Sequence, residues 1–258
     1  MTASPTGERA RPGRPATVAG GLLAITLAAG CGSSSGGGSI ASPSASASPS
    51  GSTSPSATDT SAAPASDNPF STASAAPAAG GLRDFHDAST GVSLTMPVDY
   101  VVATTPAQAA ARFPAVLGTG VGVATQVSDA QTRLKNNTIM IAFHPPIGGV
   151  SDNVGVIKLA GEAPTDPTQI QSSVFVGQVR SSLTNVGAKN IRFTDTKIGG
   201  EPAEQIDYSI TPTGAGTVFG RQFYLAAGKD IFVVTITAGT AARAATAGDF
   251  IAASWKIT

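Results

Sequence analysis

The chain has 258 residues, 16 lysines and arginines against 16 aspartates and glutamates, and a single cysteine. A formal net charge of zero leaves no basic stripe to neutralise phosphates, so the composition argues against nucleic acid as a partner. A single cysteine excludes an intramolecular disulfide, which many small secreted domains rely on for stability.

The N-terminal residues predict export from the cytoplasm. Residues 1–15 contain several arginines, and residues 16–30 (ATVAGGLLAITLAAG) carry no charge. The apolar run is shorter than the roughly 20 residues that span a bilayer. This order of a basic and then an apolar region is typical of a secretory signal peptide, which we assign to 1–30.

The small residues before Cys31, in the stretch AAGC, resemble the lipobox of bacterial lipoproteins. In that motif the cysteine is diacylated and becomes the N-terminus after cleavage. Leucine usually stands three places before the cysteine, whereas Leu27 stands four places before it. We therefore predict lipidation at Cys31, with enough acyl chains for stable anchoring at the outer face of the cytoplasmic membrane. The alternative is an ordinary cysteine after an ordinary signal peptide.

A low-complexity segment follows and completes the predicted region 31–81. In residues 32–81, 45 of 50 residues are Gly, Ser, Ala, Pro or Thr. Such a segment has too little apolar surface to offset the entropy of ordering, so it predicts a disordered tether. A flexible coil of this length spans about 40 Å. A glycosylated stalk is the alternative, because Ser/Thr-rich stretches with proline are typical O-glycosylation substrates.

The folded domain is predicted over 82–258, long enough for one sizeable core. RDFHDASTGVSLTMP predicts a hairpin, because apolar Val92, Leu94 and Met96 alternate with polar residues around a Ser-Thr-Gly turn. A short helix is expected at 106–112, then a flexible loop at the glycine-rich LGTGVGVATQ. Strands are expected at NTIMIAFHPP and at 154–160.

The second half predicts one long helix and several antiparallel strands. The helix is expected between Asp166 and Gly187, and the positions that form its apolar stripe are Ile170, Val174, Phe175, Val179, Leu183 and Val186. Four strand candidates follow in NIRFTDTKI, EPAEQIDYSITP, GTVFGRQFYLAAG and DIFVVTITAG. IFVVTI is apolar on both faces, which favours a central strand. A last helix at 241–253 and a short strand in SWKIT close the chain.

These elements predict an α+β domain, a central antiparallel sheet flanked by helices. The opening DFHDASTGVSLTMPVDY, the late run of long strands and the closing FIAASWKI resemble the PsbP-like fold. Together with the lipobox and tether, the domain resembles the LpqN-type lipoproteins of actinobacteria. The resemblance implies a PsbP-like α/β/α sandwich and a binding or accessory role, and it brings no family-wide catalytic residue to carry over.

The search for reactive groups begins with the two histidines. His86 lies between Asp84 and Asp87, a pattern that could serve as a base or a weak metal ligand. His144 is predicted to be a partly buried structural residue. The two are far apart in sequence and lack the spacing of zinc ligands, so no metal or cofactor is predicted.

Other catalytic motifs are missing from the sequence. No serine stands in a G-x-S-x-G elbow, and the glycine-rich stretch lacks both the third glycine of a dinucleotide loop and a G-K-[ST]. Glu201 and Glu204 are expected to be exposed beside a Pro-Ala turn. Core packing is favoured over a ligand cleft for the aromatic residues, which are Phe219, Phe223, Tyr224, Phe232 and Trp255.

The sequence therefore favours a non-catalytic binding or scaffolding module for an envelope protein, lipid or glycan. Two alternatives stay open. One is an envelope-acting hydrolase with a site assembled around His86. The other is a carrier of lipid or another apolar ligand, which requires an internal cavity.

Overall fold

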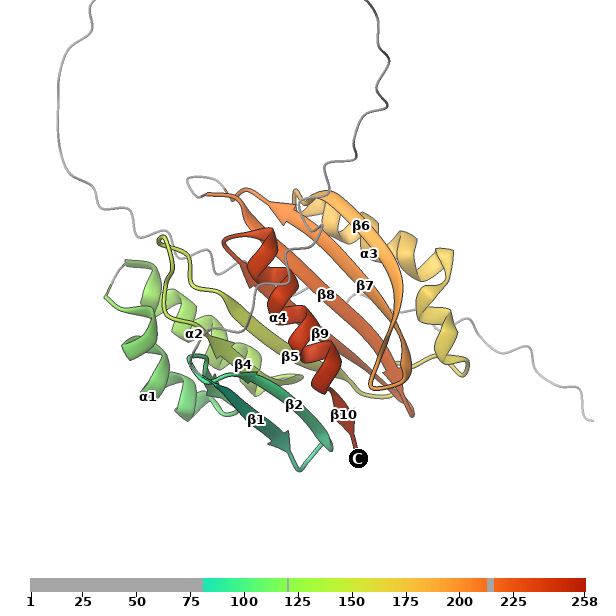
Figure 1. Cartoon of the computed structure of the whole chain (residues 1–258), viewed down its shortest axis with the longest axis horizontal. Helices are drawn as coiled ribbons and strands as arrows, with labels where there is room; N and C mark the ends of the chain where they lie inside the picture. Colours follow the sequence, from blue (N-terminus) through green and yellow to red (C-terminus); the bar gives the residue numbers. More distant parts are fainter. Residues whose placement is uncertain (1–80, 120, 213–215) are drawn as a thin grey trace, which may run out of the picture.

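The computed structural model describes residues 81–119, 121–212 and 216–258 (Figure 1). The expected signal peptide (1–30), Cys31 and the tether up to residue 80 lie outside the described residues. Predictions that concern export, lipidation and the tether thus remain predictions. The first described strand begins at Leu82.

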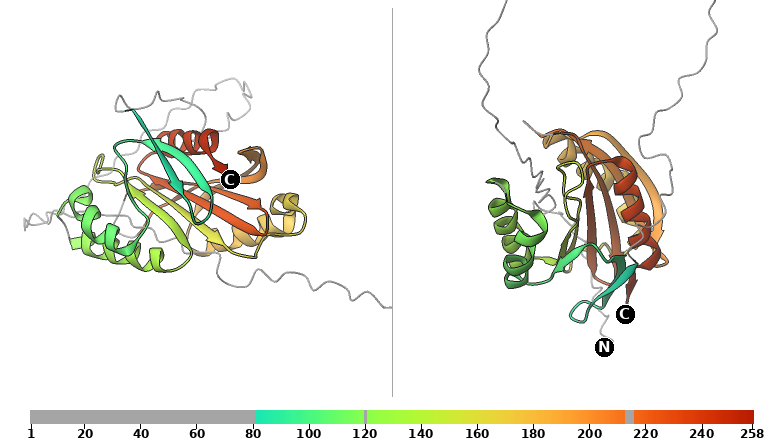
Figure 2. Two further views of the ribbon diagram at one scale, coloured as in Figure 1. Left: turned by 90° about the horizontal axis from the view of Figure 1, so that it is seen from below. Right: turned by 60° about the vertical axis from the view of Figure 1, so that its left-hand side comes forward.

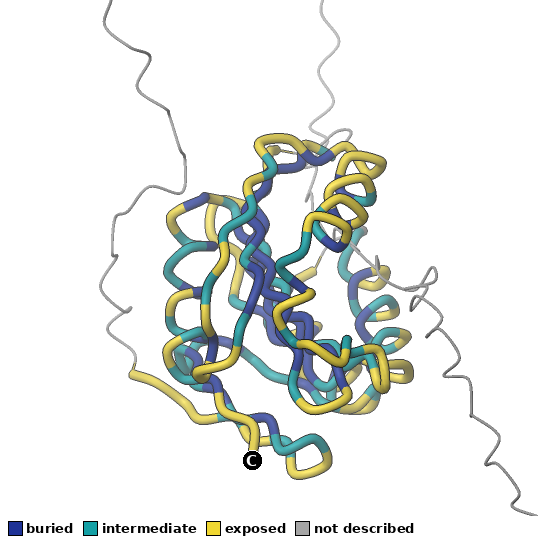
Figure 3. Tube along the Cα trace, turned by 90° about the vertical axis from the view of Figure 1, so that its right-hand side faces the viewer, coloured by how far each residue is buried: buried dark blue, intermediate teal, exposed yellow. Residues whose placement is uncertain are grey.

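A seven-stranded antiparallel sheet forms the centre of the domain, with strand order β3-β4-β5-β9-β8-β7-β6. Its strands are β3 (Val101–Ala103), β4 (Thr138–Phe143), β5 (Asn153–Leu159), β6 (Lys189–Ile198), β7 (Glu201–Ile210), β8 (Val218–Ala227) and β9 (Asp230–Ala238). Most of the buried residues lie in these strands (Figure 3). The strand β9 holds the middle position, which confirms the central strand expected from IFVVTI.

A smaller sheet joins the two ends of the domain. It contains β1 (Leu82–Asp87), β2 (Val92–Pro97) and β10 (Lys256–Ile257), in the order β1-β2-β10. The predicted hairpin is confirmed, and the last strand pairs with it rather than with the main sheet. Gly91 has a positive φ of 71° and lies against the Thr258 carbonyl, where any side chain would collide.

Helices and the hairpin cover the two faces of the main sheet (Figures 1 and 2). On one face, α4 (Ala241–Ser254) and β2 enclose a single apolar cluster with the sheet. The other face carries α1 (Pro106–Leu117) and α2 (Val121–Lys135) at one end, and η1 (Pro167–Gln171) and α3 (Ser173–Asn185) at the other. This arrangement confirms the α+β sandwich, a central antiparallel sheet flanked by helices.

The prediction of a flexible loop at LGTGVGVATQ is wrong, because the helix α2 begins inside this stretch at Val121. Gly118, with a φ of 80°, ends α1. Beyond it Val123, Val127, Ala130 and Leu134 recur at helical spacing and pack in one cluster against α1 and β4. The tertiary packing of this stripe outweighs the low helix propensity of Gly122 in the first turn of α2.

The single helix expected over 166–187 is divided. Ser172 is extended between η1 and α3, and its Oγ accepts a hydrogen bond from the Phe175 amide at 3.3 Å, capping α3. Val174 lies on a different side of α3 from the buried Phe175 and is 69% exposed, and Val186 stands just past the end of α3 and is 39% exposed. Neither lies in the apolar stripe. Gly187, with a φ of 81°, does follow the end of the helix as expected.

Candidate functional site

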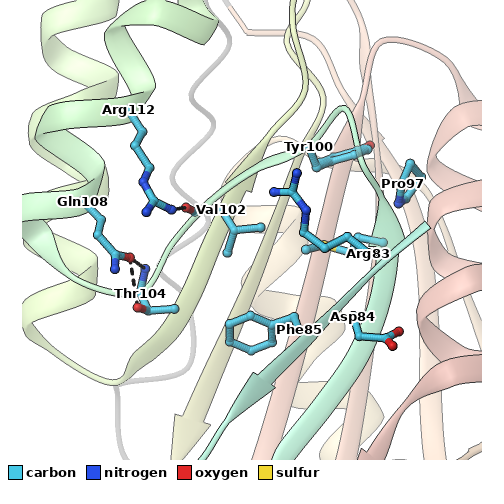
Figure 4. A pocket seen from close by; sticks show the side chains of 10 residues that line it. Arg83, Asp84, Phe85, Pro97, Tyr100, Val102, Thr104, Gln108 and Arg112 are labelled. Atoms are coloured by element: carbon cyan, nitrogen blue, oxygen red, sulfur yellow. Dashed lines mark hydrogen bonds between the residues drawn. The ribbon is translucent and has the colours of Figure 1, made fainter. Parts of the chain in front are cut away.

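A pocket of about 220 Å³ opens between the β1–β2 hairpin, the strand β3 and the helix α1 (Figure 4). Its lining residues are Arg83, Asp84, Phe85, Met96, Pro97, Tyr100, Val102, Thr104, Gln108 and Arg112. They come from segments that adjoin one another in sequence, from the first strand to the first helix. The N-terminal fifth of the folded domain therefore forms this pocket.

Strand alternation and a helix cap set the geometry of the pocket. Arg83 and Phe85 lie on one face of β1, and Asp84 lies on the other and points away from them (Figure 4). At the start of α1, Thr105 Oγ1 accepts a hydrogen bond from the Gln108 amide at 3.2 Å. Gln108 Oε1 in turn accepts from the Thr104 amide at 2.9 Å. These bonds fix the first turn of α1 against the pocket.

Two arginines stand at the edge of the pocket. Arg112 Nη1 donates to the Val102 carbonyl at 3.0 Å, and Arg83 is exposed. The ion pairs found among the described residues all involve other side chains. A guanidinium without a carboxylate partner is well suited to bind an anion, because its planar N–H groups match carboxylate and phosphate oxygens. The pocket thus combines apolar walls with two available cations.

Tyr100 forms the inner wall of the pocket and is 6% exposed. Burial, together with the charges of Asp152 and Asp99, raises the pKa of its phenol well above the ordinary value, while Arg243 opposes the shift. The Tyr100 hydroxyl therefore keeps its proton well beyond neutral pH and does not act as a base there.

Two close pairs of polar side chains lie behind Tyr100. His144 Nε2 lies 2.8 Å from Asp99 Oδ2, and the imidazole packs edge-on against Tyr100 at a centroid distance of 5.3 Å. Arg243 Nε lies 2.8 Å from Asp152 Oδ2. His144 is partly buried and held by these contacts, as expected of a structural histidine. This network supports the pocket wall from behind.

The residues around His86 do not form a triad. His86 Nδ1 lies 2.8 Å from Ser93 Oγ on the exposed hairpin. Asp84 accepts a hydrogen bond from Thr95 Oγ1 at 2.8 Å, and Asp87 accepts one from the Thr90 amide at 3.0 Å. Among the described contacts, neither carboxylate touches the imidazole, so the serine–histidine pair lacks an orienting acid.

Glu204 was expected to be exposed, and that expectation is wrong. Glu204 lies inside β7 rather than at a turn and is 1% exposed. Alternation along β7 turns it inward, toward η1, and the Gln171 amide of η1 donates to the neighbouring Ala203 carbonyl at 3.0 Å. Burial, and then the nearby Asp195 on β6, raise the pKa of the Glu204 carboxyl to about 7. Glu201 is exposed as predicted.

The aromatic residues pack in the core, as favoured from the sequence. Phe223, Phe232 and Trp255 belong to the cluster between the sheet and α4, where the last two rings lie edge-to-face at 5.9 Å. Tyr224 is fully buried on the opposite face, and Phe219 is partly buried.

The sequence search missed the pocket arginines, because neither stands in a motif and only the fold brings them together.

Two further searches cover only residues 81–119, 121–212 and 216–258. In them no group of three or more histidine, cysteine, aspartate or glutamate side chains is arranged to hold a metal ion. In the same ranges no helix has the length and apolarity needed to cross a bilayer.

Comparisons with known proteins found solved structures that are similar to this chain, but no match by sequence. No protein-family model matches the chain, and no curated protein matches it. Cyanobacterial PsbP from Synechocystis is similar in structure, with 12% identity and a TM-score of 0.44 over 69% of this chain and 94% of that one. LpqN of Mycobacterium tuberculosis, described as involved in cell envelope biogenesis, has 16% identity and a TM-score of 0.40 over 69% and 91%. At such identities a likeness bears on the fold alone.

Proposed function

We propose that this protein is a non-catalytic binding module held at the outer face of the cytoplasmic membrane by lipid on Cys31. The pocket beside Arg83 and Arg112 carries this proposal, because it joins apolar walls to two guanidinium groups that form no ion pair with any carboxylate of the described residues. The finer assignment, an LpqN-type lipoprotein of an actinobacterium, belongs to the same proposal and rests on the lipobox, the tether and the pattern of strands.

The size of the pocket favours a fragment of a larger partner. Sites that enclose a whole small molecule usually measure roughly 300–1,000 Å³. A volume of about 220 Å³ accommodates one anionic group and a short apolar neighbour. Such groups occur in an acidic protein segment, a lipid headgroup or an acidic glycan, the three kinds of envelope partner expected from the sequence.

The two alternatives receive less support. For a lipid carrier, the space between the sheet and α4 is filled by a continuous apolar cluster. For a hydrolase, the His86–Ser93 contact is the one favourable observation, and the Asp84 and Asp87 carboxylates bind elsewhere. An activity screen on envelope substrates tests the hydrolase directly, because turnover that His86→Ala abolishes would establish it.

Native mass spectrometry of the full-length protein, isolated gently from its own membranes, tests the binding function. We expect a discrete adduct or a co-purifying protein in the wild type and its loss in the double variant Arg83→Gln/Arg112→Gln. The matched control is Arg180→Gln, which removes an exposed arginine on α3 that stacks on Phe193 at 4.6 Å. Bare polypeptide in the wild type, or equal adducts in all three proteins, would refute the proposal.

The anchor has a separate test. Replacing Cys31 with serine removes the thiol that lipidation requires, so the variant should move from the membrane fraction to the soluble fraction. Replacing Ser33 with alanine nearby serves as a control that should stay with the membrane. Retention of Cys31→Ser on membranes would show that another element anchors the protein.

A further inference from the structure

A polar row crosses the centre of the sheet on the face that carries α2 and α3. On this face the apolar side chains form two separate clusters, one beneath α1 and α2 and one beneath η1 and α3, whereas the opposite face has one continuous cluster. Between the two helix pairs (Figure 2), Gly155, Thr235 and Gln222 are partners across β5, β9 and β8. Paired residues of antiparallel strands point to the same face, so these three groups share it.

Arg133 of α2 reaches over this row. Its Nη2 lies 2.9 Å from the position that a Cβ on Gly155 would take, so the missing side chain makes room for the guanidinium. Arg133 Nε is buried without a hydrogen-bond partner, and the ion pairs among the described residues do not include Arg133. Desolvation lowers the pKa of Arg133, and only Asp129, one helical turn away, opposes the shift.

A partly buried guanidinium that forms no close ion pair destabilises a folded protein, since its lost hydration is not fully replaced. Arg133 is half-buried, so its outer nitrogens remain within reach of a ligand. An anion placed there would supply a close ion-pair partner and accept two parallel hydrogen bonds.

Thr235 adds a second donor at the same point of the sheet. The Tyr224 hydroxyl donates to Gln222 Oε1 at 3.3 Å, and Gln222 Nε2 donates to Thr235 Oγ1 at 3.2 Å. Because Thr235 Oγ1 accepts in this chain, its own hydrogen is free to donate. The chain of bonds ends beside Gly155, where Arg133 also lies.

Gln126 provides an acceptor on the same flank of α2. It stands two turns before Arg133, about 10 Å along the helix axis. Gln126 is 7% exposed, and its Oε1 is buried without a donor. A ligand that satisfies both residues needs a hydroxyl or amide hydrogen some distance from its anionic group, which a bare phosphate ion lacks.

We propose that Arg133 and Thr235 bind a small hydroxylated organic anion, namely a sugar acid or a sugar phosphate, on the sheet face opposite α4. Arg133 binds the anionic group, Thr235 donates to one of its oxygens, and Gln126 accepts from a hydroxyl. This site uses residues other than those of the pocket at Arg83 and Arg112, so the two can fail independently.

Thermal unfolding and calorimetric titration of the full-length protein test the site with glucuronate, glucose 6-phosphate and uncharged glucose at matched ionic strength. We expect one or both anions to bind and raise the unfolding midpoint, while glucose does neither. Response to glucuronate alone identifies a carboxylate ligand, and response to glucose 6-phosphate alone identifies a phosphate ligand.

Variants separate a binding residue from a structural one. Arg133→Met should lower the affinity at least about tenfold, the value of hydrogen bonds to a charged group, while the ligand-free protein keeps or raises its midpoint. Gly155→Ala should displace the guanidinium and weaken binding to a lesser degree. The control Lys135→Met removes an exposed cation from the same helix and should bind normally.

Three results would overturn the proposal: neither anion affects the wild type, Arg133→Met binds as the wild type does, or glucose acts equally well. An unchanged response in Arg83→Gln/Arg112→Gln is expected, and it distinguishes this site from the pocket.

Discussion

Glu204 should make the stability of this protein decrease as the pH rises toward neutrality. Burial raises its carboxyl pKa from 4.5 to about 7 in the folded protein. Between these two values the folded protein holds the proton more tightly than the unfolded chain does. Stability is therefore complete below about pH 4.5 and is lost as the pH rises through 7, the reverse of the behaviour of a salt-bridged carboxylate.

The magnitude follows from the displacement of the pKa. A change from 4.5 to about 7 corresponds to at most about 3.5 kcal/mol, since each pH unit is worth about 1.4 kcal/mol. Glu204→Gln introduces a neutral amide of similar shape. The unfolding free energy of the variant should lie within about 1 kcal/mol of the wild-type value near pH 5 and exceed it by up to about 3.5 kcal/mol near pH 8.

Urea unfolding followed by circular dichroism, at several values between about pH 5 and pH 8, measures this difference. Glu201→Gln is the matched control, because it makes the same substitution at an exposed position of the same strand. The unfolding free energy of this control should change with pH as that of the wild type does. If the unfolding free energy of Glu204→Gln also followed the wild type at every pH, the reasoning about the buried carboxyl would be refuted.

Two packing predictions concern the sheet. Gly220→Ala would press a methyl group into the buried Tyr208 ring and cost about 1–3 kcal/mol in urea unfolding, whereas Gly216→Ala, with open space around it, should cost little. Asp207 lies 2.7 Å from Arg221 with both side chains buried, so Asp207→Ala should cost about 3 kcal/mol. Removing the 72% exposed Asp249 from the same arginine should cost less than about 1 kcal/mol. Equal losses in either pair would contradict the dependence on burial.

Local patterns predicted most of the secondary structure. The hairpin around Gly91, the four late strands and the closing helix have alternation, turn residues or apolar stripes that act over a few neighbouring positions. The sequence also predicted the core role of the aromatic residues, since large apolar side chains are buried wherever a sheet is covered. Errors occurred where local signals competed, as at α2, where glycines before the helix and in its first turn concealed the stripe through Val123 and Leu134.

The sequence by itself determined the α+β class, the order of most elements and the expectation of an anchored, tethered domain, because these depend on composition and on short-range periodicity. Only the tertiary structure decided which side chains meet. It placed Arg112 of α1 and Arg83 of β1 at one pocket, Arg133 over Gly155, and Glu204 beneath η1. Strand order and helix placement determine these contacts. The residues that flank a position along the chain do not show which residues will lie beside it across the sheet.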